Sequence, residues 1–190
     1  MATVSLRALT AKTLFLLSLA TAKRIGELQN LSLSVMSCAS DIVVSYLPRF
    51  LAKTETLQNP LPRSFPVKSL ADFAGNLEDR KLCPVRALKC YLARTKDLPG
   101  RSQHLFCSVS NPSRALSKNG ISFFLREVIT NAGAVRGDGA TPPRAHSIRA
   151  VATSKAFARN VAVNKILTAA TWRMNSVFST LWAMLCHWVP

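Results

Sequence analysis

Apolar residues recur at helical spacing along the first part of the chain. Leu16, Leu19, Ile25 and Leu28 keep this spacing from TLFLLSLATA through KRIGEL. A stripe of this kind is typical of one face of a helix packed on a core. We therefore predict a single buried helix across this stretch, which carries Arg24 to the surface.

The same apolar run has the form of a secretory signal peptide. Arg7 and Lys12 precede it, and it ends in small residues. The run is too short to span a bilayer. A core helix explains the run without cleavage, whereas a signal peptide predicts a mature protein that starts after Ala22. Sequencing the N-terminus of the expressed product distinguishes the two interpretations.

Alternating and β-branched residues in the next part of the chain indicate a small antiparallel sheet. Residues 41–47 predict a strand, residues 48–49 a turn, and residues 50–54 a returning strand. This arrangement places Lys53 on a hairpin. A third strand is predicted near residues 65–67.

Two amphipathic helices are predicted after the sheet. The first covers residues 82–95 and has Pro84 in its first turn, where proline is favoured. The second covers residues 117–130, with Ser117 as its N-cap. Both carry an apolar stripe that belongs to a core.

The last third of the chain begins with a predicted loop, rich in Gly and Pro, at residues 133–143. It leads to a helix that starts near His146, and further helices are predicted at residues 162–171 and 176–187. The whole pattern predicts one α+β domain over residues 1–190, mainly helical and with a small antiparallel sheet.

Positive charge dominates this sequence. Lys and Arg number 25 against 9 Asp and Glu, giving a net charge of +16. No acidic residue follows Asp138, whereas basic residues continue at Arg144, Arg149 and Lys155. Such an excess favours a polyanionic partner, either nucleic acid or an acidic membrane surface.

The cysteines suggest neither a disulfide framework nor a metal site. There are five, an odd number, without regular spacing, which favours a reducing compartment. Cys83, Cys90, His104 and Cys107 lack the short Cys-x-x-Cys spacing of zinc sites. We predict no metal and no other cofactor.

A set of side chains suited to a phosphodiester stands out. His146 and Arg149 lie three residues apart and would share one helix face. Arg24, Lys53 and Trp172 complete the set. Chemistry on a phosphodiester requires its charge to be neutralised and its leaving oxygen to be protonated. Arginine, lysine and histidine side chains provide these functions.

Five stretches carry a family resemblance: LSLATAKRIGELQNLS, FLAKT, LCPVRALKCYLART, PRAHSIRAVATSKAF and AATW. In this order, over about residues 10–182, they resemble the catalytic domain of tyrosine recombinases, the phage-integrase family. They are most similar to the recombinases encoded by DIRS- and Ngaro-type retrotransposons. The family's separate N-terminal DNA-binding domain has no counterpart among these residues.

The resemblance implies a role for each residue of the set. Arg24 and Arg149 would bracket the scissile phosphate, and Lys53 would protonate the 5′-oxygen leaving group. His146 would assist proton transfer or hydrogen-bond the phosphate, and Trp172 stands where the family has His or Trp. Arg24 and Arg149 would bind DNA directly.

The resemblance also extends the implied DNA contacts beyond this set. Arg144 and Lys155 would add to the DNA-binding surface. Glu27, which follows Arg24, stands where the family has an acidic residue and would orient Arg24 or support the fold.

The sequence departs from the family at the nucleophile. The family has a tyrosine about ten residues after the Trp172 position, and this chain has Trp182 there. The only tyrosines are Tyr46 and Tyr91. An indole cannot form the covalent phosphodiester that strand cleavage requires. Residues 173–190 are therefore a divergent tail, and a shifted reading frame there would explain the tryptophan.

These features predict a domain derived from a mobile-element tyrosine recombinase. Its ancestral function would be DNA integration and recombination by strand cleavage and rejoining, impaired here; the alternative is a non-catalytic DNA-binding or interaction remnant. The expected partner is double-stranded DNA, on which the chain could form a homo-oligomer, and no membrane. The expected location is nuclear or otherwise intracellular, or secreted if the N-terminal run is a signal peptide.

Overall fold

The computed structural model describes residues 4–53, 55–56, 58, 60–70, 80–136, 144–145 and 147–170, with the side chains of residues 133–136 excepted. Three residues of the predicted site, His146, Trp172 and Trp182, lie outside these ranges. The predicted helix at residues 176–187 lies outside them as well.

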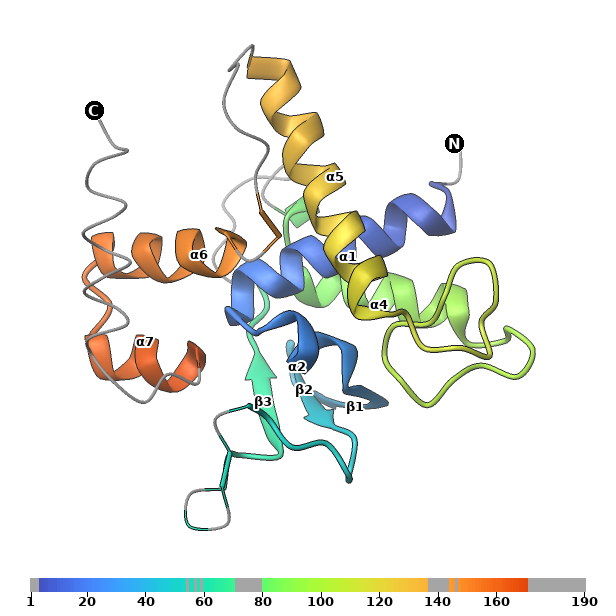
Figure 1. Ribbon diagram of the computed structural model, residues 1–190, viewed down its shortest axis with the longest axis horizontal. Coiled ribbons are helices and arrows are strands. Elements are labelled where there is room, and N and C mark those ends of the chain that lie inside the picture. Colours follow the sequence, from blue (N-terminus) through green and yellow to red (C-terminus); the bar gives the residue numbers. More distant parts are fainter. Residues whose placement is uncertain are drawn as a thin grey trace.

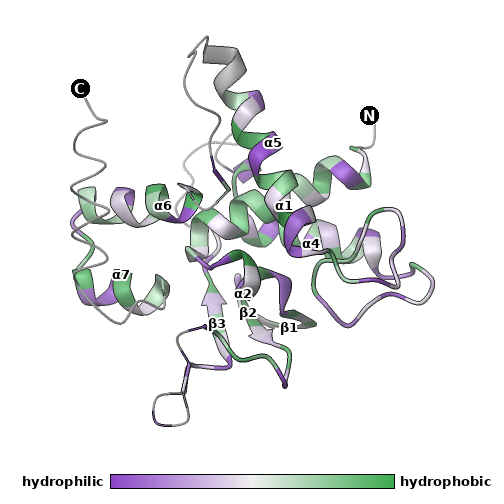
Figure 2. Cartoon of the chain, in the orientation of Figure 1, coloured by the Kyte–Doolittle hydropathy of each residue, from purple (hydrophilic) through white to green (hydrophobic). Residues whose placement is uncertain are grey.

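Helix α1 (Leu6–Thr21) is the central element of the fold. Leu14 and Leu17 on it are fully buried, and Figure 2 shows α1 as apolar along most of its length. The helix packs against three others: α4 (Pro84–Thr95), α5 (Lys118–Arg136) and α6 (Ser147–Ala158). Burial on several sides explains why apolar residues make up most of the α1 sequence.

Polar residues of α1 are buried without leaving their hydroxyl groups unsatisfied. Thr10, Thr13, Ser18 and Thr21 each donate a hydrogen bond to the carbonyl four residues earlier, at 2.7 Å. These bonds remove most of the cost of burying a hydroxyl. Within the described ranges, no helix is long and apolar enough to cross a membrane.

The single helix predicted through KRIGEL is in fact two helices. α1 ends at Ala22, which has φ 50° and donates its amide to the Ser18 carbonyl at 2.9 Å. The chain then turns into the short helix α2 (Ile25–Gln29), with Arg24 at its N-cap. Leu19, predicted to face the core, is 38% exposed.

The sheet has three antiparallel strands in the order β1 (Leu31–Cys38), β2 (Asp41–Tyr46) and β3 (Ser64–Val67). The predicted strands at residues 41–47 and 65–67 are confirmed as β2 and β3. The prediction missed β1, which pairs with β2 through a tight turn at Ala39 and Ser40.

The returning strand predicted at residues 50–54 is wrong over residues 50–53, and residue 54 lies outside the described ranges. The amide of Phe50 donates to the Leu47 carbonyl at 3.0 Å, and the Phe50 carbonyl accepts a hydrogen bond from the Arg63 guanidinium. These backbone groups therefore serve a turn rather than a strand ladder. The turn that carries Lys53 lies between β2 and β3.

The starts of α4 and α5 follow the sequence signals. Pro84 is the first residue of α4, and the Ser117 hydroxyl accepts the Gly120 amide at 3.0 Å, as an N-cap does. α5 continues to Arg136, so the loop predicted from residue 133 begins later. α7 (Val163–Ala170) matches the helix predicted at residues 162–171.

The architecture is a mainly helical α+β domain, as predicted. Figure 1 shows α1, α4 and α5 grouped on one side of the sheet, with α6 and α7 beside them. α2 lies where the helices meet the sheet, and it contacts α5. The residues that join α1 to α2 are therefore placed between the sheet and α6.

Candidate functional site

The candidate site is built around a buried carboxylate, that of Glu27. Glu27 lies in the first turn of α2 and is 2% exposed. Its Oε2 accepts the backbone amide of Arg24 at 2.6 Å, which closes the N-terminus of the helix. This bond fixes the carboxylate in the position where two arginines approach it.

Of the two arginines that approach Glu27, Arg24 has the more exposed side chain. Its Nη1 lies 3.6 Å from Glu27 Oε1, and its side chain is 30% exposed. An ion pair with a buried partner restrains the side chain, which stays partly exposed. Arg24 can therefore bind an external anion without first being ordered.

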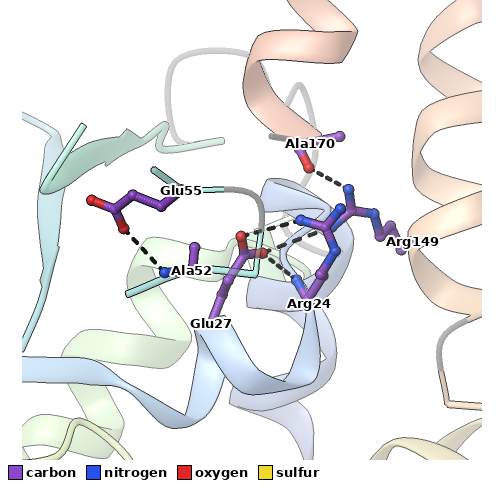
Figure 3. Close-up of polar contacts among 6 residues, drawn as sticks. All are labelled: Arg24, Glu27, Ala52, Glu55, Arg149 and Ala170. Carbon is purple, nitrogen blue, oxygen red and sulfur yellow. Dashed lines mark hydrogen bonds and ion pairs between the residues drawn. The ribbon is translucent and has the colours of Figure 1, made fainter. Parts of the chain in front are cut away.

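Arg149 approaches the same carboxylate from α6. Its Nη1 lies 3.7 Å from Glu27 Oε2, and its Nη2 donates a hydrogen bond to the carbonyl of Ala170 at the end of α7. Figure 3 shows both guanidinium groups directed at Glu27. Arg149 therefore links α2, α6 and α7 at a single point.

The site holds more positive than negative charge. Burial, and then the charge of Arg24, lowers the pKa of Arg149 to about 10, although Glu27 opposes this. Arg149 is still protonated at neutral pH. Two guanidinium groups on one carboxylate leave a net positive charge, which favours an anion that can accept several hydrogen bonds.

A small pocket of about 80 Å³ lies beside this cluster. Three cationic residues line it, Lys23, Arg24 and Arg149, together with apolar residues that include Leu28 and Ile148. The sequence interpretation did not single out Lys23. Its position next to Arg24 was the available signal.

Lys53 occupies an exposed turn, not a strand. The carboxylate of Glu55 holds this turn, since it accepts hydrogen bonds from the Ala52 amide at 3.0 Å and from Arg63 Nη1 at 2.8 Å. The Ala52 amide and then Arg63 hold the pKa of Glu55 below its usual value. The turn is thus ordered, while the Lys53 side chain extends into solvent.

The remaining described residues of the predicted DNA surface are exposed. Arg144 precedes α6, and its carbonyl accepts the amide of Ser147 at 2.9 Å. Lys155 lies on α6, the helix that also carries Arg149, and it is exposed too. The structure brings Arg24 and Arg149 together, with Lys155 on the helix that carries Arg149 and Arg144 just before that helix.

Both tyrosines of the chain are buried. Tyr91 is 0% exposed, and its hydroxyl accepts the Cys107 amide at 3.1 Å. Tyr46 is 6% exposed and packs against Phe50 and Phe65. Burial raises the pKa of both phenols, and Glu27 raises that of Tyr46 further. Neither hydroxyl has the ionisation or exposure of a nucleophile.

The four residues considered for zinc lie in separate surroundings. The Cys83 sulfur contacts Ser69, the Cys107 sulfur contacts Tyr91, and His104 Nδ1 lies 2.8 Å from the Gln29 carbonyl. Cys90 is exposed. Across the part of the chain that the structure covers, no three His, Cys, Asp or Glu residues are grouped for a metal ion.

Comparison with known proteins gives matches at the level of structure. No protein-family model matches the chain, and no curated protein matches its sequence. XerA recombinase superposes with a TM-score of 0.59 at 18% identity, over 91% of this chain and 56% of that one. A lambda integrase fragment, solved as a dimer bound to a COC′ core site, superposes with a TM-score of 0.55 at 13% identity.

The fold is that of the tyrosine-recombinase catalytic domain. The lambda integrase match covers 91% of this chain and 52% of that one, so the chain spans about half the length of both solved proteins. At these identities the likeness establishes the fold. The function has to be argued from the residues of the site.

Proposed function

We propose that this domain binds double-stranded DNA through the phosphodiester backbone, with Arg24 and Arg149 on one phosphate. The observation that carries the proposal is the meeting of two guanidinium groups, from α2 and α6, on the buried carboxylate of Glu27. Fixed arginines of this kind are suited to the tetrahedral, multiply hydrogen-bonding phosphate group.

The charge of the whole chain supports a polyanionic partner. The net charge is +16, and Arg144 and Lys155 are exposed on or next to the helix that carries Arg149. Contacts of this sort give affinity without reading sequence. We expect duplex binding with little sequence preference, inside the compartment that holds the DNA, and compatible with a homo-oligomer along the duplex.

The recombinase motifs suggest what this site evolved to do. In a tyrosine recombinase reaction, the arginines neutralise the phosphate while a lysine donates a proton to the departing 5′-oxygen. Lys53 would be that lysine, and His146 and Trp172 would complete the site. The stretches LSLATAKRIGELQNLS and PRAHSIRAVATSKAF favour an origin in DIRS- or Ngaro-type mobile elements.

We further propose that this chain binds DNA without cleaving it. By the family resemblance, Trp182 stands where the nucleophile is expected, and the chain's two tyrosine hydroxyls are both buried with raised pKa values. A covalent phosphotyrosyl intermediate needs an accessible phenol, and the residues described supply none. The tyrosines of the chain therefore favour a domain that binds DNA and does not cleave it.

Two charge-matched variants test the binding site. Arg24→Gln removes one positive charge from the cluster, and Arg86→Gln removes one from the exposed side of α4. A charge-assisted contact contributes about 1.5–3 kcal/mol, so Arg24→Gln should weaken duplex binding about tenfold or more in a fluorescence anisotropy titration. Arg86→Gln should change it less than about threefold. Equal losses for the two variants would show that binding is diffuse and would overturn the proposed site.

A further inference from the structure

A lysine that the proposed function does not use is buried beside the site. Lys23 lies between α1 and α2, directly before Arg24, and is 8% exposed. Its Nζ lies 4.6 Å from the ring centroid of Phe65 on β3 and 6.0 Å from that of Tyr46 on β2. Aromatic faces hold an ammonium group at such distances, so the side chain has a defined position.

Charged groups on two neighbouring elements surround Lys23. Arg24 and Glu27 on α2 and Arg149 on α6 all interact with it electrostatically. Lys23, Arg24 and Arg149 also line the same small pocket. Arg24 and Arg149 pair with the Glu27 carboxylate at 3.6 and 3.7 Å, and Lys23 adds a third positive charge near this cluster.

The surroundings of Lys23 disfavour its charge. Burial lowers the pKa of Lys23, and Arg149 and Arg24 lower it further, while Glu27 raises it by less than the sum of these effects. The lowered pKa means that the protonated ammonium costs stability below the folded-state pKa. That cost disappears as the pH rises through the unfolded-state value. A lysine placed at such a cost is characteristic of a functional site.

We propose that Lys23 is a third cation of the phosphate site, held by the rings of Phe65 and Tyr46 and adding its charge to those of Arg24 and Arg149 when a phosphodiester is bound. This inference rests on the proposed function and adds one residue to it. The negative charge of a bound phosphate would balance the excess positive charge of the cluster. The Lys23 ammonium, which lowers the stability of the free protein, would then stabilise the complex with DNA.

The test is Lys23→Met, which keeps the length and apolar stem of the side chain and removes the charge. We expect duplex affinity to fall about tenfold, as for loss of one charged contact. We also expect the slope of log K against log salt to become shallower by about one. The melting temperature of the free protein should rise at neutral pH, because a disfavoured charge is gone.

Lys12→Met is the matched control, because Lys12 is an exposed lysine of α1. It should change neither the salt slope nor the melting temperature appreciably. Lys23→Arg keeps the positive charge and should retain more affinity than Lys23→Met. A Lys23→Met protein that is less stable and keeps the salt slope of the wild type would show a purely structural lysine and overturn the inference.

The outcomes separate this inference from the proposed function. If Arg24→Gln weakens binding and Lys23→Met does not, the phosphate site stands and the role of Lys23 is wrong. If neither variant changes duplex affinity, the site itself is wrong. Raised stability together with reduced affinity in Lys23→Met is the result that supports both.

Discussion

At the scale of single residues, Glu27 determines the geometry of the candidate site. It caps the first turn of α2 through the Arg24 amide and pairs with the guanidinium groups of Arg24 and Arg149. The carboxylate is 2% exposed, so water cannot replace it. Without it, the two arginines would repel each other across the site.

Glu27→Gln should therefore destabilise the protein. The amide side chain can still accept a hydrogen bond but carries no charge, which leaves two arginines without their shared partner. We expect a loss of about 2 kcal/mol or more in the free energy of unfolding, measured by urea denaturation. Glu127→Gln is the control: Glu127 pairs with Arg7 at the surface, at 2.6 Å. That variant should lose less than about 1 kcal/mol, and equal losses would contradict the role assigned to Glu27.

A second residue-scale prediction concerns the nucleophile position. Trp182→Tyr places a phenol where the recombinase resemblance expects one. If the ancestral chemistry is otherwise intact, a covalent 3′-phosphotyrosyl adduct should form on a suicide duplex substrate and be visible on a denaturing gel. Its rate should be low, because an error of about one ångström in placement costs about a hundredfold.

The unmodified chain is the control for that experiment, and it should give no adduct. An adduct formed by the wild type would contradict the proposal of binding without cleavage, and mapping the attached peptide would identify the nucleophile. Failure of Trp182→Tyr to form an adduct would indicate that residues 173–190 do not place position 182 at the phosphate.

At the scale of elements, two short turns place the site. The break at Ala22 separates α1 from α2 and directs Arg24 toward α6. The turn at Ala39 reverses the chain from β1 into β2, which carries Tyr46 beside Lys23. Both alanines have a positive φ, 50° and 51°, a conformation that favours glycine.

Ala39→Gly should stabilise the protein. Ala39 is exposed, so glycine relieves the strain of φ 51° without removing buried surface. The expected gain is about 0.5–1 kcal/mol in the free energy of unfolding. The same change at Ala93, an exposed position within α4, should cost about 1 kcal/mol. Opposite signs for the two variants are the expected result, and a loss at Ala39 would contradict the turn conformation.

The elements also show which parts of the fold the sequence predicts. Pro84 and Ser117 mark the starts of α4 and α5, because both act locally. No Gly or Pro marks the break at Ala22. The apolar spacing continues past it, and one helix was therefore predicted in place of two. β1 was missed although LSLSV alternates apolar and polar residues. The register shift between Leu31 and Val35 belongs to the pairing with β2, which the sequence does not show.

At the scale of the whole molecule, the site is a product of long-range packing. Arg24 and Arg149 meet because α1 packs on α6 and α2 follows α1 directly. The family motifs indicated that these two arginines act together, but no periodicity in the sequence does so. The burial of Lys23 against Phe65 depends on the pairing of β2 with β3 and could not be read from the chain alone.

The net charge of +16 is also a property of the whole molecule. It sets the long-range attraction to DNA, whereas the Arg24 and Arg149 cluster sets where a phosphate is held. Both contributions release counterions when DNA binds, so both weaken as salt is added. Salt dependence therefore measures how many phosphates the protein neutralises.

The central claim is that this domain binds the DNA backbone, and the most direct test is duplex affinity as a function of salt. The measurement is a fluorescence anisotropy titration between about 50 and 200 mM salt. If about five or six phosphates are neutralised, the slope of log K against log salt should be about −5. An affinity that does not change with salt, or no binding to duplex DNA at all, would contradict the account.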